Sequence, residues 1–150
     1  MTSTIVLISG ANRGIGKGLL ELYLAKPNHT VIAANRDPEN AGSKALSNLT
    51  TGTESHLIIV KVDGSVENDA LEAVQALSSQ GIDHIDIVIA NAGVSYAWPK
   101  VSELKIEDLQ GHLVPNVFGV VRLYQATLPL LLKASKPKFG TIGSTAGCLE

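Results

Sequence analysis

The sequence lacks the features on which several classes of protein depend. Cys148 is its one cysteine, so no internal disulfide forms, and no group of Cys and His residues has the spacing of a zinc site. Aromatic residues make up 4% of the chain and no basic stripe is present, which argues against nucleic acid as a partner. The apolar run at 128–132 is too short to span a bilayer, and no signal peptide is recognisable. We therefore expect a cytoplasmic protein without a metal site, a membrane or a nucleic-acid partner.

Length and composition are those of a folded globular domain. The 150 residues are 45% hydrophobic and 17% charged, which excludes disorder and allows a sizeable core. No linker, repeat or low-complexity segment divides the chain, so we predict a single domain over residues 1–150. The net charge of -2 is uneven, because residues 1–36 hold four cations and one carboxylate, a net charge of +3, and the rest carries -5. Either the cations gather at a site for an anion or they are scattered over the surface.

Apolar runs and helical stretches alternate along the chain. The runs are continuously apolar, which is typical of strands buried on both faces in a parallel sheet. The sequence therefore predicts an α/β fold, a Rossmann-type doubly wound parallel sheet with strand order 3-2-1-4-5. The longest helical stretch is expected to form one helix or two, with a kink at Pro115. We expect strands at 4–8, 30–34, 57–62, 85–90 and 139–142, and helices at 14–25, 39–49, 67–79 and 101–133.

Three glycines connect the first expected strand to the first expected helix. Gly10 allows a tight turn, Gly14 allows the backbone to approach a diphosphate, and Gly16 allows helix and sheet to pack closely. The helix start directs free amide groups at the phosphates. The spacing departs from G-x-G-x-x-G, so the strand before it and the helix after it carry the interpretation, and an ordinary glycine-rich turn is the alternative. We predict a dinucleotide site in which Asn12, Arg13 and Ile15 complete the loop.

Each expected strand ends in polar or glycine residues. Ligands of open parallel sheets bind beyond the carboxyl ends of the strands, although Asn, Asp, Gly and Ser are also the usual turn formers. The residues concerned are Ser9 and Gly10, Asn35 and Arg36, Asp63 and Gly64, Asn91, Ala92 and Gly93, and Gly143, Ser144 and Thr145.

The residues after the second strand favour NADP over NAD. An NAD site usually has a carboxylate there, which accepts from the ribose 2'-hydroxyl and repels a 2'-phosphate. This sequence has Asn35 followed by Arg36, and Arg13 lies in the glycine loop, so two guanidinium groups can bind a 2'-phosphate. NAD becomes the better choice if the strand ends two residues later, because the Asp37 carboxylate then stands where it can accept from the ribose 2'-hydroxyl.

The pattern Ser9-Gly10-x-x-x-Gly14-x-Gly16, the run Asn91-Ala92-Gly93, Asn116 and Ser144 resembles the motifs of the short-chain dehydrogenase/reductase family. Residues 28–38 are most similar to fungal ketoreductases related to norsolorinic acid ketoreductase. The resemblance implies that Ser144 and Asn116 are catalytic and that Asp63 contacts adenine. It also implies a small carbonyl or alcohol substrate and a homodimer or homotetramer.

The family's catalytic tyrosine and lysine are expected beyond residue 150, because its Y-x-x-x-K lies roughly a dozen residues after the serine. Tyr96 and Lys100 have this spacing, but Pro99 opposes a helical turn there. We thus predict part of an NADP-dependent carbonyl reductase, without the carboxyl-terminal strands and helices of the family fold. The alternative is a non-catalytic dinucleotide-binding module or an inactive truncated reductase. A methyltransferase is disfavoured, because methyltransferases with a similar sheet usually have an acidic residue at the position where this chain has Asn35 and Arg36.

Several further residues have two interpretations. Asp63 is an adenine contact or the N-cap of the third helix. Tyr96 and Trp98 line a substrate pocket or pack as a lid. His29, His56, His84 and His112 stand apart and are interpreted as surface histidines.

Overall fold

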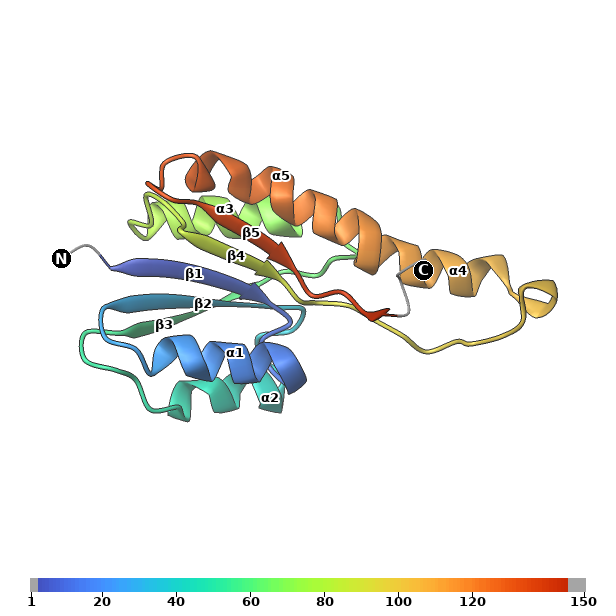
Figure 1. Cartoon of the computed structure of the whole chain (residues 1–150), viewed down its shortest axis with the longest axis horizontal. Coiled ribbons are helices and arrows are strands. Elements are labelled where there is room, and N and C mark those ends of the chain that lie inside the picture. Colours follow the sequence, from blue (N-terminus) through green and yellow to red (C-terminus); the bar gives the residue numbers. More distant parts are fainter. Residues whose placement is uncertain (1–2, 146–150) are drawn as a thin grey trace.

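The computed structural model describes residues 3–145 and has three layers, with a parallel sheet between two layers of helices (Figure 1). The strand order is β3-β2-β1-β4-β5, and all four pairs are parallel. The predicted fold class and strand order are confirmed. The strands are β1 (Thr4–Ser9), β2 (His29–Asn35), β3 (His56–Lys61), β4 (Ile87–Ala90) and β5 (Lys138–Thr141).

The helices cover the two faces of the sheet separately. The helices α1 (Gly14–Leu24) and α2 (Ala41–Lys44) lie on one face, and α3 (Asp69–Ser79) and α5 (Gly119–Leu131) lie on the other (Figure 1). Alternate side chains of β1 enter different cores, because Val6 and Ile8 belong to the cluster under α1, whereas Ile5 and Leu7 belong to the cluster under α3 and α5. This double burial explains why the strand is continuously apolar.

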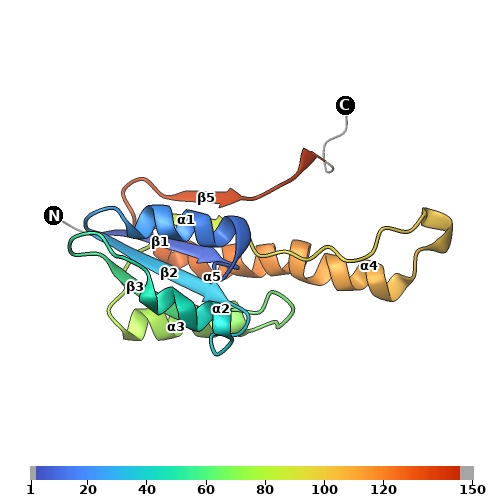
Figure 2. The same cartoon turned by 90° about the horizontal axis from the view of Figure 1, so that it is seen from below.

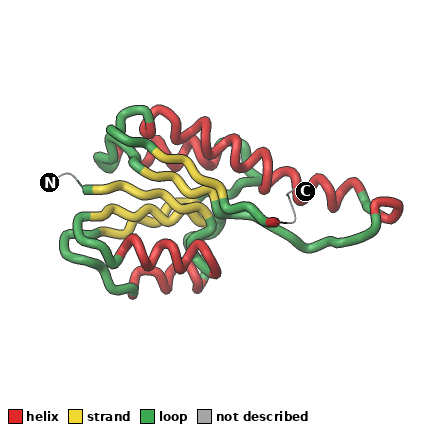
Figure 3. Tube along the Cα trace, in the orientation of Figure 1, coloured by secondary structure: helices red, strands yellow, loops and turns green. Residues whose placement is uncertain are grey.

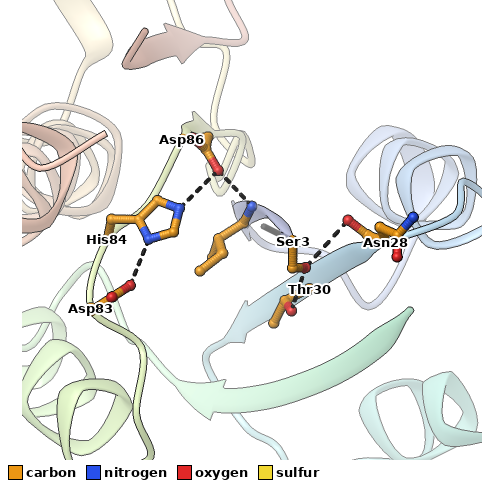
Figure 4. A network of polar contacts seen from close by, with 7 residues as sticks. Ser3, Asn28, Thr30, Asp83, His84 and Asp86 are labelled. Atoms are coloured by element: carbon orange, nitrogen blue, oxygen red, sulfur yellow. Dashed lines mark hydrogen bonds and ion pairs between the residues drawn. The ribbon is translucent and has the colours of Figure 1, made fainter. Parts of the chain in front are cut away.

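The fourth strand begins two residues later than predicted. Ile85 is buried, but its N–H donates to the Leu130 carbonyl of α5 (3.2 Å) rather than to a neighbouring strand. Asp86 then joins the amino-terminal edge of the sheet, where its Oδ2 accepts from the N–H of Ile5 (2.8 Å). His84 lies between this carboxylate (3.4 Å) and that of Asp83 (2.6 Å), as Figure 4 shows.

Two predicted helices are interrupted. The stretch predicted at 39–49 consists of α2 and a 3-10 turn, η1 (Ala45–Asn48). The stretch predicted at 101–133 consists of a 3-10 turn, η2 (Val101–Glu103), the helix α4 (Ile106–Leu113), a π-helical turn, η3 (Val114–Phe118), and α5. Pro115 has no N–H for the Gly111 carbonyl, and the wider π turn accommodates this loss without breaking the helix.

The segment around α4 projects beyond the carboxyl-terminal edge of the sheet (Figure 2). The chain leaves β4 as a long irregular loop, turns at η2 and returns along α4 and η3 to α5. Among residues 3–145, no helix has both the length and the apolar character needed to cross a membrane.

Candidate cofactor and active site

A cavity of about 670 Å³ opens at the carboxyl-terminal edge of the sheet. The loops that follow the strands meet at this edge (Figure 3), and those after β1, β2, β3 and β4 all contribute to the cavity wall. The lining residues are Gly10, Asn12, Arg13, Gly14, Arg36, Asp37, Asn40, Val62, Asp63, Gly64, Ser65, Asn91, Ala92, Gly93, Val94 and Pro115.

The glycine loop has the geometry that its sequence predicts. Gly10 (φ 66°) and Gly14 (φ 55°) adopt left-handed backbone conformations that favour glycine. A Cβ on Gly10 would lie 3.0 Å from the Cα of Ala92, and a Cβ on Gly16 would overlap the Gly10 carbonyl and the Asn91 amide. The loop after β1 therefore packs directly on the loop after β4, which leaves no room for a side chain at Gly16.

The first turn of α1 has no anionic partner among residues 3–145. Its N-cap, Arg13, has an extended backbone and makes no side-chain cap, and the first turn contains no acidic residue. The amide groups and the positive end of the helix dipole therefore remain available to an anion. Ile15, which we predicted as part of the site, is 65% exposed and does not line the cavity.

Asn35 lies behind the glycine loop rather than in the cavity. Its side chain is 1% exposed, its Oδ1 accepts from the N–H of Ala11 (2.9 Å), and its Nδ2 donates to Ser43 Oγ (3.1 Å). The Ser43 hydroxyl in turn donates to the Asp37 carbonyl (2.8 Å). Asn35, which we predicted as a cofactor-binding residue, thus supports the loops from inside and does not itself line the cavity.

Two guanidinium groups and one carboxylate follow the ends of β1 and β2. The strand β2 ends at Asn35, one residue later than predicted, so Arg36 is the first residue beyond it, and both Arg36 and Arg13 are exposed and line the cavity. Within the described part of the chain, neither guanidinium has an ion-pair or hydrogen-bond partner. Asp37 also lines the cavity, but its Oδ1 accepts from the N–H of Glu39 (2.9 Å) and stabilises the turn into α2.

Ser9 and Asn91 fasten the loop after β1 to the loop after β4. Ser9 Oγ accepts from the N–H groups of Asn91 and Ala92 (both 3.0 Å), and the Asn91 amide donates to the carbonyls of Ser9 (3.0 Å) and Gly10 (3.2 Å). Sequence reasoning noted Ser9 as the end of a strand and as part of the glycine-rich motif, but not as a link between two loops. Its role depends on a contact between residues far apart in the sequence, so no local pattern indicated it.

Asp63 lines the cavity from the loop after β3. Its Oδ1 accepts from the N–H of Ser65 (2.9 Å), and its own N–H donates to Asp69 Oδ2 (3.0 Å). The helix α3 begins at Asp69 with Asn68 as N-cap, so the alternative role of Asp63 as the N-cap is wrong. The buried Asp69, which sequence reasoning missed, also pairs with Lys61 (3.2 Å) and fixes this loop.

Asn116 lies on the π turn and holds the loop after β4. Its Oδ1 accepts from the N–H of Val94 and its Nδ2 donates to the Val94 carbonyl, both at 2.8 Å. A Cβ on Gly93 would lie 3.2 Å from Asn116 Oδ1, which is a tight contact, so glycine eases this close approach. Asn116 is thereby joined to the cavity wall, which includes Gly93 and Val94.

Ser144 lies at the same edge of the sheet, because it follows β5. Thr141 pairs with Ala90 of β4, and the N–H of Ile142 donates to the Ala90 carbonyl (3.0 Å). Ser144 is exposed and lies three residues beyond the end of β5. Asn91, Ala92 and Gly93 occupy the corresponding place after β4. Cys148 lies outside the described residues.

Tyr96 and Lys100 are not a catalytic pair on one helix face, since residues 91–100 form no helix. The Tyr96 ring stacks on His112 with 4.2 Å between ring centroids. His29, His84 and His112 are half-buried and hydrogen-bonded, so of the four histidines that we interpreted as surface residues only His56 is exposed. No group of three or more His, Cys, Asp and Glu side chains between residues 3 and 145 is arranged to hold a metal ion.

Comparisons with known proteins agree on one family. A family model described as short chain dehydrogenase matches residues 4–150. The short-chain dehydrogenase srdF of Neurospora crassa is 41% identical over 150 residues, which are 98% of this chain and 58% of that protein. Norsolorinic acid ketoreductase nor1 of Dothistroma septosporum is 45% identical over 144 residues, 94% of this chain and 53% of that protein.

A solved structure has the same fold. The NADPH-bound carbonyl reductase from chicken fatty liver superposes with a TM-score of 0.84 at 28% identity, over 98% of this chain and 59% of the other. The chain thus spans between half and three fifths of the length of these similar proteins.

Proposed function

The chain belongs to the short-chain dehydrogenase family, and from that premise we propose that it is the cofactor-binding part of an NADP(H)-dependent ketoreductase. A bound nicotinamide dinucleotide supplies or accepts the hydride that converts a ketone or aldehyde into an alcohol. The cavity fits such a group, since its wall combines a helix start without an anionic partner, two left-handed glycines and two guanidinium groups.

The observation that carries the choice of NADP is the pair Arg13 and Arg36. Both line the cavity, and neither has an anionic partner in the described part of the chain. The nearby Asp37 directs one carboxylate oxygen at the Glu39 amide and stabilises the turn into α2. Guanidinium groups bind phosphate with paired, charge-assisted hydrogen bonds, so they favour a 2'-phosphate over a 2'-hydroxyl.

The remaining residues divide the cavity by role. We assign the diphosphate to Gly14 and the start of α1, with Gly10 and Asn12 completing the loop, and the adenosine to the side of Arg36 and Asp63. Asn91, Ala92 and Gly93 form the opposite wall. Asn116 and Ser144 lie at the substrate side, where the Ser144 hydroxyl donates to the substrate oxygen and polarises the carbonyl.

The proton donor is proposed to come from a tyrosine and a lysine encoded beyond residue 150. The positive charge of such a lysine lowers the pKa of the tyrosine hydroxyl, which then gives its proton to the developing alkoxide. On this account the 150-residue chain by itself binds NADPH but does not reduce a carbonyl compound.

The exposed apolar residues of α4, η3 and α5 fit the expectation of a homodimer or homotetramer. Such side chains rarely form contiguous exposed patches on monomers. We propose that the complete protein covers them with its own carboxyl-terminal part or with a second copy. They are Leu109, Leu113, Val117, Phe118, Val121 and Tyr124.

Charge reversal at Arg36 tests the cofactor assignment. Calorimetric titration of the chain with NADPH and NADH should show that Arg36→Asp weakens NADPH binding roughly ten- to hundredfold, as expected for the loss of charge-assisted hydrogen bonds, and changes NADH binding little. The matched control is Lys136→Asp, which reverses an exposed charge in the loop before β5. Equal losses for both cofactors in Arg36→Asp would contradict the assignment.

A further inference from the structure

The irregular loop after β4 is fixed to α4 and η3 at two points. Val94 is held by Asn116, and the N–H of Tyr96 donates to His112 Nε2 (3.1 Å). The two contacts are two residues apart on the loop (Val94 and Tyr96) and four residues apart on the helix (Asn116 and His112). Two extended residues and about one helical turn cover a similar length, so the two segments run side by side. The loop therefore lies along one face of the helix as an extended segment (Figure 2).

The hydrogen bonds of His112 determine its tautomer. Nδ1 lies 2.6 Å from the Asp108 carbonyl oxygen, which can only accept, so Nδ1 carries the proton. Nε2 then has a lone pair directed at the N–H of Tyr96. The His112 ring thus joins the helix backbone to the loop backbone.

The Tyr96 side chain strengthens this connection. Its ring stacks on His112 with an interplanar angle of 21°, and its hydroxyl donates to the Asp108 carbonyl (3.4 Å). A Cβ on Gly111 would overlap the Tyr96 hydroxyl, so the absence of a side chain at Gly111 makes space for it. One backbone hydrogen bond and one ring stack therefore hold the loop at the same point.

Beyond Tyr96 the loop carries an exposed indole. Trp98 is 81% exposed, and the described residues provide no hydrogen bond to Ala97, Trp98 or Pro99. Val94 lines the cavity, and Trp98 follows it by four residues, which limits its Cα to about 14 Å from that of Val94. The bond to His112 is thus the last fixed point before the indole.

We propose that His112 is a positioning residue, which holds residues 94–98 beside the cofactor cavity and thereby sets the place of Trp98 at the substrate side. This inference rests on the proposed function, because it assigns the substrate side from the cofactor site. Sequence reasoning left open whether Tyr96 and Trp98 form a pocket wall or a lid. The inference divides these roles, since Tyr96 packs on the helix whereas the exposed Trp98 is left to face a substrate.

The single tryptophan provides a direct test. Tryptophan emission overlaps the absorption of reduced nicotinamide, so energy transfer from Trp98 to bound NADPH reports where the loop lies. His112→Phe keeps the ring stack but removes the acceptor, and should reduce the transfer while the Kd for NADPH stays within about twofold. His112→Gln places an amide oxygen near the former Nε2 and should restore most of the transfer.

Amide hydrogen exchange supplies the matched internal control. In His112→Phe the Tyr96 amide should lose about tenfold of its protection, whereas the Val94 amide, held by Asn116, should keep its own. His112→Asn, whose shorter amide reaches Asp108 but not Tyr96, should behave like His112→Phe and serves if the phenylalanine variant does not fold.

The outcomes separate the two claims. Unchanged transfer in His112→Phe or His112→Asn, with or without faster exchange at Tyr96, overturns the positioning role of His112. Failure of the unaltered chain to bind NADPH overturns the proposed function instead. Reduced transfer at unchanged affinity, restored by glutamine, supports the proposal.

Discussion

At the scale of single residues, Gly16 and Gly18 lie two residues apart on α1 but differ in the space around their Cα atoms. A Cβ on Gly16 would overlap backbone of Gly10 and the side chain of Asn91, whereas a Cβ on Gly18 would meet nothing within 4 Å. The first glycine is required by packing between two loops of the site. The second lowers the helix propensity without any packing contact.

We expect opposite effects of alanine at these two positions. Gly16→Ala should destabilise the fold by about 1 to 3 kcal/mol, as overpacking of a tight contact does, and should weaken NADPH binding at least about tenfold because the glycine loop shifts. Gly18→Ala should stabilise the fold by roughly 0.5 to 1 kcal/mol and leave binding unchanged. Urea unfolding and NADPH titration measure both, and a harmless Gly16→Ala would contradict the packing argument.

Asp83 gives a prediction about pH. A hydrogen bond from His84, supported by the charges of His84 and Lys133, outweighs desolvation and lowers the pKa of Asp83 below its ordinary value of 3.8. A carboxyl group with a lowered pKa stabilises the fold above its unfolded pKa, and this contribution is lost as pH falls through the folded pKa.

The variant Asp83→Asn should therefore be less stable than the unaltered chain near neutral pH and equally stable in strong acid, where Asp83 is protonated. Urea unfolding at a series of pH values measures the difference, which should be small because Asp83 is exposed. A stability difference that is constant from neutral to acid pH would contradict the role of this carboxylate.

At the scale of elements, the strands could be predicted and the long helical stretch only in part. The strands β1 to β4 are readable because each contributes to both cores, so burial leaves a continuous apolar run. Pro115 indicates a disturbance, but whether the helix kinks or widens depends on its neighbours. Gly64 and Gly119 meet here, since a Cβ on Gly119 would lie 2.9 Å from the Gly64 Cα.

The site shows the same division. The glycine loop and the cavity residues Arg36, Asp63 and Asn91 follow from their places at strand ends. Asn35 stands at a strand end too, yet its burial depends on Ala11 and Ser43, which no local pattern reveals. The linking role of Ser9 and the contribution of Asp69 were not predicted for the same reason, because their partners lie on other elements.

Close approach of α5 to the loop after β3 should make Gly119 intolerant of a side chain. Helix propensity alone predicts that Gly119→Ala stabilises the helix by about 1 kcal/mol. We expect instead a loss of about 1 to 3 kcal/mol, because a Cβ would press on the Gly64 backbone and on the carbonyl that accepts from Arg122 (3.2 Å). Thermal or urea unfolding of Gly119→Ala and Gly18→Ala, measured side by side, tests this expectation. Equal stabilisation of the two variants would refute the close contact.

At the scale of the whole molecule, the described residues form one three-layer structure, and the chain spans 53% to 59% of the length of two similar proteins. The cavity, the glycine loop and both arginines all lie within it. We therefore expect the chain to bind NADPH while an assay of carbonyl reduction detects no turnover. Turnover by the 150-residue chain alone would show that the proton donor lies within these residues.

The central claim is that Arg13 and Arg36 bind the 2'-phosphate of the cofactor. Calorimetry with adenosine 2',5'-bisphosphate and adenosine 5'-monophosphate tests this most directly, because the two ligands differ only in that phosphate. The bisphosphate should bind at least about tenfold more tightly, and the difference should disappear when both arginines are replaced by alanine. Equal affinity of the unaltered chain for the two ligands would contradict the claim.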